Sequence, residues 1–352
     1  MRAVVYDAYG PARVASVRDV PPPAKKPGTL LVRVRAAALN PKDVLVRKGK
    51  FKLVTGFGFP RTMGYDWAGE VVSGDATFPE GTKVFGMIGA WAGGAFAEVA
   101  RVSPNELARM PEGLTFVEAA SLPLASLTAL QALRDEARVA PGHRVLLHGA
   151  SGGVGVLAVQ IAKALGAHVT TTSSEANRPL LTSLGADETL DYRALDFAKG
   201  EGFPHPLEAF FDIFGNQSFA KIRPFLGPEG TYVSTVPSAR VVLDTLTTRL
   251  PTRRRARLVV VRSRRSDLET IARLVREEKL RPVVDAVFPL DGIAQASTEP
   301  TELIWRDGRN GRRIAAHAVR IDGAYLSLLR AANGKRLYQE LVLEESDTRY
   351  DL

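Results

Sequence analysis

The residues whose types and spacing point most clearly to chemistry lie in one stretch, Arg144–Gly166, which reads RVLLHGASGGVGVLAVQIAKALG. It combines an apolar run typical of a buried strand, a glycine-rich turn and an apolar-faced helix that ends at Gly166. A second strand-like run, His168–Thr172, follows at once. This order predicts a strand–helix–strand unit whose turn binds the pyrophosphate of a dinucleotide at the N-terminus of the helix.

The turn residues have separate expected roles. Gly152 allows the backbone to approach the phosphates, and Gly155 allows the helix to pack closely on the strand. The first glycine of the usual pattern is replaced by Ala150. The other residues expected at the phosphates are Ser151, Gly153 and Val154.

Polar residues after the second strand bear on the choice of cofactor. An NAD-dependent enzyme usually carries Asp or Glu there, whereas this chain has Ser173 and Ser174, with Arg178 four residues further on. Hydroxyl groups and a guanidinium suit a 2′-phosphate that a carboxylate would repel. NADPH is therefore the predicted cofactor. Two alternatives stay open: the serines cap a helix, or Glu175 turns inward and favours NAD.

The composition indicates a soluble globular protein of two domains, since 352 residues are 45% hydrophobic and 24% charged. The absence of cysteine excludes disulfides and cysteine–zinc sites. No stretch approaches the roughly 20 apolar residues that span a bilayer, and the strand-like opening MRAVVYDAYG does not resemble a signal peptide. We expect a cytoplasmic enzyme with no membrane partner.

The net charge of +9 is partly concentrated in one segment. Such a density of arginine is able to contact nucleic acid. However, the strand-like Leu258–Val261 splits the segment, and no aromatic side chains are interleaved for base stacking. A solvated surface is the favoured interpretation, with nucleic acid not an expected partner. The arginines concerned are Arg249, Arg253, Arg254, Arg255, Arg257, Arg262, Arg264 and Arg265.

Two regions differ in pattern. Residues 1–115 are rich in valine, glycine and proline in short alternating runs, which predicts a β-rich, barrel-like domain. Beyond Phe116 strands and helices alternate, as in an α/β doubly wound parallel sheet. Later strands are expected at 188–191, 207–214, 230–235 and 257–261, helices at 179–184 and 267–279, an extended segment at 283–289, and a helix-like run at 324–332. The predicted domains are 120–264 for the dinucleotide and 1–119 with 265–352 for the β-rich catalytic part, with 319–352 left unassigned.

This order of parts resembles the medium-chain dehydrogenase/reductase superfamily, and within it the zinc-free quinone oxidoreductase branch. The motifs that carry the resemblance include AAALNPKDVLVRKG (36–49), MGYDWAGEVV (63–72), GASGGVGVLAVQIAKALGA (149–167) and KLRPVVDAVFPLDGIAQA (279–296). The resemblance implies a Rossmann sheet beside a GroES-like barrel and hydride transfer from a nicotinamide cofactor. It also implies a homodimer paired through the last strand of the sheet, Arg257–Val261.

Both zinc-ligand positions of the zinc-dependent relatives differ here. Those relatives place a cysteine where this chain reads Asn40-Pro41-Lys42-Asp43, and Gly-His-Glu where it reads Gly64-Tyr65-Asp66. The five histidines show no ligand spacing. No metal is therefore expected, and His148 is expected to be a satisfied core or rim histidine.

The resemblance implies further cofactor contacts. Tyr192 contacts the 2′-phosphate, and Thr128 approaches the nicotinamide. Phe214, Thr235 and Val236 follow strand ends beneath the cofactor, where ligands of such sheets bind. For Phe214 and Val236 core packing is the alternative.

A hydride transferase without a metal must activate its acceptor by positioning and hydrogen bonds, which suits quinones and α,β-unsaturated carbonyls. The candidate catalytic residues are Asn40 and Tyr65 as donors to the acceptor oxygen and Asp43 as an orienting carboxylate of ordinary pKa. A turn-forming Asn40 and an interface-packing Tyr65 are the alternatives. Two other functions stay open: an enoyl-thioester reductase, and a cofactor-bound RNA-binding or regulatory protein with little turnover. The aromatic residues expected around the acceptor are Phe51, Phe57, Phe59 and Trp91.

Overall fold

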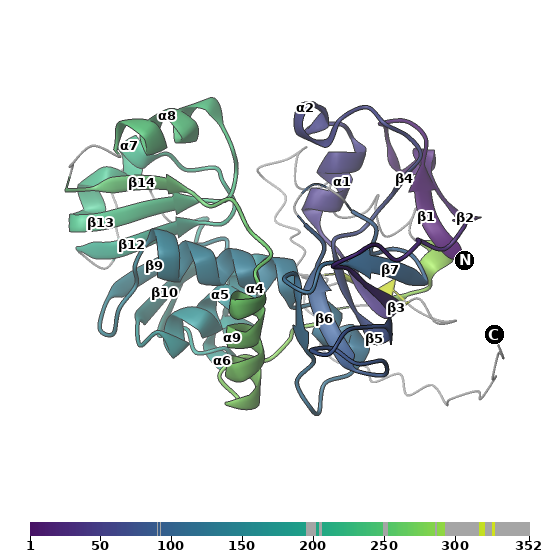
Figure 1. Cartoon of the computed structure of the whole chain (residues 1–352). Coiled ribbons are helices and arrows are strands. Elements are labelled where there is room, and N and C mark those ends of the chain that lie inside the picture. The colour runs from purple at the N-terminus through teal and green to yellow at the C-terminus, as the bar shows by residue number, and fades with distance from the viewer. Residues whose placement is uncertain are drawn as a thin grey trace.

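The computed structural model describes residues 1–89, 91, 93–194, 202–203, 206–248, 253–285 and 287–292, together with the backbone of 317–320 and 326–327. A β-rich lobe and an α/β lobe lie side by side (Figure 1). The predicted fold class is confirmed: a parallel α/β sheet accompanies an antiparallel, β-rich domain.

The α/β lobe is built on six parallel strands in the order β11-β10-β9-β12-β13-β14. Successive strands are added on one side of β9 as far as β11 and on its other side from β12 onward. The order therefore reverses between β9 and β12, and such sheets bind ligands in the crevice at this point. The strands are β9 (Arg144–His148), β10 (His168–Ser173), β11 (Glu188–Asp191), β12 (Leu207–Asp212), β13 (Leu226–Ser234) and β14 (Arg255–Leu258).

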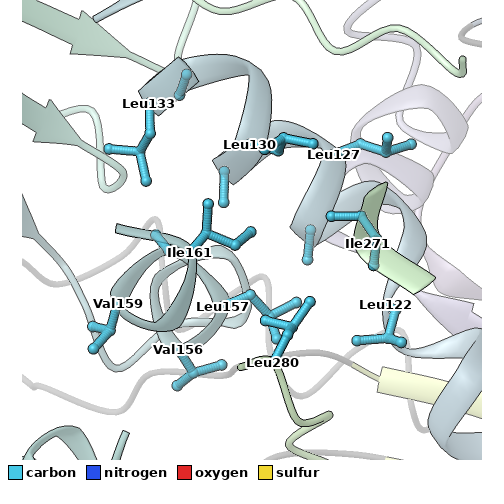
Figure 2. Close-up of a cluster of buried hydrophobic side chains, with 14 of the residues drawn as sticks. Leu122, Leu127, Leu130, Leu133, Val156, Leu157, Val159, Ile161, Ile271 and Leu280 are labelled. Carbon is cyan, nitrogen blue, oxygen red and sulfur yellow. The ribbon is translucent and has the colours of Figure 1, made fainter. Parts of the chain in front are cut away.

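Helices cover both faces of this sheet because its strands are apolar on both sides. In β9, Leu147 packs in the same core cluster as the helices α4 (Pro123–Leu130), α5 (Gly153–Ala164) and α9 (Arg265–Arg276). Leu146 points the other way, into a cluster with α7 (Phe219–Ile222) and α8 (Ala239–Thr247). Figure 2 shows the first cluster, where leucines of α4 meet the α5 side chains and Ile271 of α9.

Proline and glycine set several helix boundaries in this lobe. Pro123 is the first residue of α4, a position where its missing N–H costs no helical hydrogen bond. The helix continues into a π-helical segment, Gln131–Glu136. A shorter helix, α6 (Arg178–Ser183), follows β10 and ends just before Gly185 in a left-handed conformation.

The β-rich lobe centres on the long strand β3, which pairs antiparallel with β5 and β7. A second, smaller sheet has the order β2-β1-β4. The strands are β1 (Arg2–Tyr6), β2 (Ala15–Asp19), β3 (Leu30–Leu39), β4 (Arg61–Thr62), β5 (Asp66–Ser73), β6 (Lys83–Met87), β7 (Val99–Val102) and β8 (Leu107–Arg109). The helices are α1 (Pro41–Arg47), α2 (Lys52–Thr55) and α3 (Phe116–Ala120).

The C-terminal part differs from the expectation. Strand β15 (Val287–Phe288) pairs with β16 (His317–Arg320), and β16 pairs antiparallel with β3. The unassigned tail therefore begins inside a strand, at residue 319. The predicted helix-like run at 324–332 is wrong at Leu326–Ser327, because these residues form the strand β17, which pairs with β16. The rest of that range lies outside the described residues.

Candidate active site

The glycine-rich turn presents an open helix end. Gly152 precedes α5 with extended backbone angles and no side-chain cap, so the first N–H groups of α5, beginning at Gly153 and Val154, face outward without a capping side chain. The Ser151 hydroxyl beside them is buried and has no hydrogen-bond partner within the described residues. An unpaired buried hydroxyl next to free N–H donors fits the pyrophosphate of a dinucleotide.

Close packing explains two residues of the turn. A Cβ at Gly155 would lie 2.3 Å from the Ala150 carbonyl oxygen, so only glycine lets α5 approach the strand end this closely. Gly149 has a φ of 86°, a left-handed conformation that favours glycine. The turn therefore takes its left-handed residue one position before Ala150, and this is why an alanine is tolerated there.

At the end of β10 the polar residues divide into buried and exposed groups. Ser173 is fully buried, and its hydroxyl donates to the Ser174 carbonyl at 2.9 Å. The Ser174 hydroxyl accepts a hydrogen bond of 3.1 Å from the Asn177 amide. Arg178 is exposed and pairs with Glu175 at 2.9 Å. Of the expected contacts to a 2′-phosphate, Arg178 is exposed and Ser174 is largely buried, whereas the fully buried Ser173 shapes the turn.

Tyr192 lies beside this strand end, because its N–H donates to the Ser173 carbonyl at 3.1 Å. The guanidinium of Arg193 lies 5.4 Å from the centre of the Tyr192 ring. Arg193 is thus a second exposed cation near this strand end, besides Arg178, and it was not among the expected site residues. The available signal was its place directly after Tyr192.

The nicotinamide end of the predicted site is formed by two strand ends and α4. The Thr235 hydroxyl donates to the Ile213 carbonyl at 2.9 Å, and Val236 packs against Gly215, so both lie beside the loop that carries Phe214. Thr128 is buried in α4 and donates to the Leu124 carbonyl at 2.7 Å. The structure thus brings Phe214, Thr235 and Val236 together.

His148 is a satisfied core histidine, as predicted. It is buried, and its ring nitrogens lie 2.7 Å from the Thr172 hydroxyl and 2.8 Å from the side-chain amide oxygen (Oδ1) of Asn216.

Asn40 connects the two lobes through Asp66. Its amide donates to the Asp66 carboxylate at 3.0 Å and to the Ala38 carbonyl at 3.3 Å, while Asp66 accepts the Leu124 N–H of α4 at 3.0 Å. Both amide N–H groups are thus engaged inside the protein. This geometry opposes the expectation that Asn40 donates to an acceptor oxygen, since its amide has no free N–H to offer.

Asp43 and Asp66 are both fully buried carboxyl groups. Asp43 accepts the Asn40 backbone N–H at 2.7 Å. Burial raises the pKa of Asp43 to about 7, although backbone hydrogen bonds and Lys42 oppose the rise. Burial likewise raises the pKa of Asp66 well above its ordinary value. No local pattern in the sequence indicates this raised pKa, because it depends on how completely the Asp43 carboxyl is buried.

The Lys42 side chain lies among aromatic residues on one side of the candidate site. The Lys42 ammonium lies 4.1 Å from the centre of the Tyr65 ring and 5.3 Å from that of Trp91. Phe51 packs against Trp91 at 5.5 Å between ring centres. Burial raises the pKa of the Tyr65 hydroxyl above its ordinary value. Lys42 was not among the expected site residues, although it stood between Asn40 and Asp43 in the same motif.

The other expected aromatic residues lie elsewhere. Phe59 packs edge-on against Tyr6 and Tyr9, and Phe57 is 66% exposed. Of the four aromatic residues expected around an acceptor, the structure brings together Phe51 and Trp91.

Nearby carboxylates offset much of the positive charge of the arginine-rich segment. Arg255 pairs with Glu229 at 2.8 Å and Arg265 with Glu269 at 2.7 Å, and carboxylates also lie within 4 Å of Arg257 and Arg264. Arg249 lies outside the described residues. The segment presents less unbalanced positive charge than its composition indicates.

The described part of the chain contains neither a cluster of metal-ligating side chains nor a membrane-spanning helix. No three His, Cys, Asp or Glu side chains there are grouped closely enough to hold a metal ion. No helix there has the length and apolar character needed to cross a membrane.

Comparisons with known proteins agree on one family. Residues 26–112 match the alcohol dehydrogenase GroES-like domain, and residues 184–299 match a zinc-binding dehydrogenase domain. A chloroplastic quinone oxidoreductase of Triphysaria versicolor is 32% identical over 84% of this chain and 93% of its own length. The human mitochondrial NAD(P)H oxidoreductase RTN4IP1 is 30% identical over 84% of this chain and 85% of its own. The structure of a Coxiella burnetii quinone oxidoreductase superposes with a TM-score of 0.78 at 32% identity, over 91% of this chain and 99% of that one.

Proposed function

Because the chain belongs to the quinone oxidoreductase branch of the medium-chain dehydrogenase/reductase superfamily, we propose that it is an NADPH-dependent, metal-independent reductase of quinones or α,β-unsaturated carbonyls. The observation that carries the proposal is the open N-terminus of α5, where the buried Ser151 hydroxyl has no partner within the described residues. That arrangement is suited to a dinucleotide, and NAD(P)H dependence agrees with the family.

The residues assigned to the cofactor fall into three groups. The pyrophosphate group is Ser151, Gly152, Gly153, Val154 and Gly155. The 2′-phosphate group is Ser174, Arg178, Tyr192 and Arg193, with Ser173 shaping the turn. The nicotinamide group is Thr128, Phe214, Thr235 and Val236. When bound, NADPH supplies the hydride, and these side chains orient it toward the acceptor.

The residue types near Tyr65 support a metal-independent reaction. Asn40 is hydrogen-bonded to Asp66, and Tyr65 is a poor metal ligand at neutral pH because its hydroxyl stays protonated. Such a site is restricted to acceptors that are already electrophilic, which quinones and enones are. Apolar acceptors of this kind suit the aromatic side chains of Phe51 and Trp91.

The test is NADPH oxidation by the purified protein, followed at 340 nm with a benzoquinone and with a medium-chain enone. We expect turnover with at least one acceptor and a higher kcat/KM with NADPH than with NADH. Failure of every quinone and enone to accelerate NADPH oxidation would overturn the proposal. A 2-enoyl thioester that outcompetes both acceptors would instead identify an enoyl-thioester reductase.

The exposed cations at the strand ends should determine cofactor preference. Replacing both, Arg178→Ser with Arg193→Ser, is expected to raise KM for NADPH at least about tenfold, since a charged hydrogen bond to phosphate contributes about 1.5–3 kcal/mol. KM for NADH should change less than twofold, because NADH lacks the 2′-phosphate. Arg276→Ser, an exposed cation on α9, is the control. Equal losses for both cofactors would contradict the assignment.

We also propose that the protein is a homodimer paired through β14, which is the edge strand of the parallel sheet. Sedimentation equilibrium measures this directly: a dimer gives twice the chain mass of 38.1 kDa. A mass that stays at one chain would contradict it.

A further inference from the structure

Lys42 is a cation that the proposed function leaves without a role. It lies in the first turn of α1, half-buried, with its ammonium over the Tyr65 ring at 4.1 Å and near the Trp91 ring at 5.3 Å. Within the part of the chain that the structure describes, no hydrogen bond or ion pair holds this ammonium. Its three N–H donors are therefore available to a bound molecule, although the charge is partly buried.

The other candidate donors at this place are less suited to deliver a proton. Both amide N–H groups of Asn40 are engaged with Asp66 and Ala38. Burial raises the pKa of Tyr65, so its hydroxyl is able to donate a hydrogen bond but is a weak acid. The Asp43 carboxyl, with a pKa of about 7, is a stronger acid but is fully buried. The half-buried ammonium of Lys42 is thus the acid with free donors beside the aromatic pair Phe51 and Trp91.

On the basis of the proposed function, we propose that the Lys42 ammonium binds the carbonyl oxygen of the acceptor and gives it a proton as hydride arrives. The acceptor gains a hydride at the β-carbon of an enone or at one oxygen of a quinone, and the displaced π electron pair moves to the carbonyl oxygen at the other end of the conjugated system. The Nζ–H bond breaks as the O–H bond of the enol or hydroquinone forms. Lys42 becomes a neutral amine and regains its proton from water.

The surroundings tune this group for the task. Burial lowers the pKa of Lys42 to about 8, while Asp43 and Asp66 oppose the fall. An acid whose pKa lies close to the working pH is well matched for general acid catalysis. The aromatic rings hold the ammonium in place by cation–π attraction without occupying its N–H groups through carboxylates. The other charged or titratable groups nearby are Arg47, Arg61 and Tyr6, which act mainly on Asp43 and Tyr65.

The first experiment compares turnover of an enone between pH 5.5 and 10 in wild type, Lys42→Met, Lys42→Arg and the exposed control Lys50→Met. Lys42→Met should lower kcat at least about a hundredfold, as expected for loss of a general acid, with an unchanged Kd for NADPH. Wild-type kcat should fall above about pH 8, where the amine loses its proton. Lys42→Arg should retain measurable turnover. Its kcat should not decrease above pH 8, because a guanidinium stays charged there.

A second measurement tests the oxygen-binding role without turnover. In the presence of NADP⁺, 4-nitrophenolate mimics the oxyanion product, and its absorption reports binding. We expect Lys42→Met to weaken nitrophenolate binding at least about tenfold, as for a lost charged hydrogen bond, and Lys50→Met to leave it unchanged. If wild type reduces no acceptor but this difference remains, the reductase proposal fails and the oxyanion role of Lys42 stands. Nitrophenolate binding and kcat within twofold of wild type in Lys42→Met would overturn the inference.

Discussion

Gly155→Ala is expected to weaken NADPH binding by at least about a hundredfold and to lower the free energy of unfolding. The added methyl would lie 2.3 Å from the Ala150 carbonyl oxygen and 2.6 Å from the Ala150 Cα. Both are backbone atoms, so a change of side-chain rotamer cannot relieve the clash. The N-terminus of α5 must then move away from β9, and a displacement of this size misplaces the phosphate donors. Overpacking of this kind costs about 1–3 kcal/mol of stability.

Fluorescence titration with NADPH and urea unfolding measure the two effects. Gly58→Ala is the matched control, since a Cβ there meets no atom within 4 Å and its φ is not in the left-handed region. Unchanged NADPH affinity in Gly155→Ala would show that the turn does not bind the cofactor through this close approach.

Asp66→Ala is expected to destabilise the protein by about 3–5 kcal/mol, the range for removing one partner from a buried polar network. The substitution leaves the Leu124 N–H and the Asn40 amide without their acceptor in a fully buried position. The same change should lower enzymatic activity, because Leu124 begins the turn of α4 that positions Thr128.

The pH dependence of stability provides a second readout for Asp66. Burial raises its folded-state pKa above the unfolded value, so the unfolded state binds fewer protons and wild-type stability falls as the pH rises through the folded-state pKa. Asp66→Ala should lack this contribution. The exposed Asp7, which forms an ion pair with Arg18 on the surface, is the control. Asp7→Ala should lower the free energy of unfolding by less than about 0.5 kcal/mol. A destabilisation of Asp66→Ala no larger than that of Asp7→Ala would contradict the proposed bridge.

Local chemistry explains which features were predictable. The strand–turn–helix unit depends on neighbouring residues, so its pattern in the sequence was sufficient to locate β9, α5 and β10. The doubly wound parallel class of the sheet followed from the alternation of strands with helices. The same reasoning identified His148 as a core residue, because it ends an apolar strand.

Features that depend on burial and long-range contacts were not predictable. The raised pKa of Asp43 arises from a fully enclosed position that no local pattern indicates. The engagement of the Asn40 amide depends on Asp66, which lies 26 residues away in the chain. Lys42 was overlooked because a lysine beside an aspartate ordinarily indicates a solvated helix face, whereas here Tyr65 and Trp91 enclose it.

The pairing of β16 with β3 has a consequence for how the protein is made. His317–Arg320 pairs with Ala36–Leu39, the last residues before Asn40. During synthesis the ribosome must therefore release nearly the whole chain before this edge of β3 acquires its partner. Until then, the end of β3 that leads to Asn40 exposes unpaired backbone groups of the kind that pair with strands of other chains. Translation that stops short of residue 317 would thus yield a product with a complete glycine-rich turn but with an unpaired, aggregation-prone edge of β3 in its β-rich lobe.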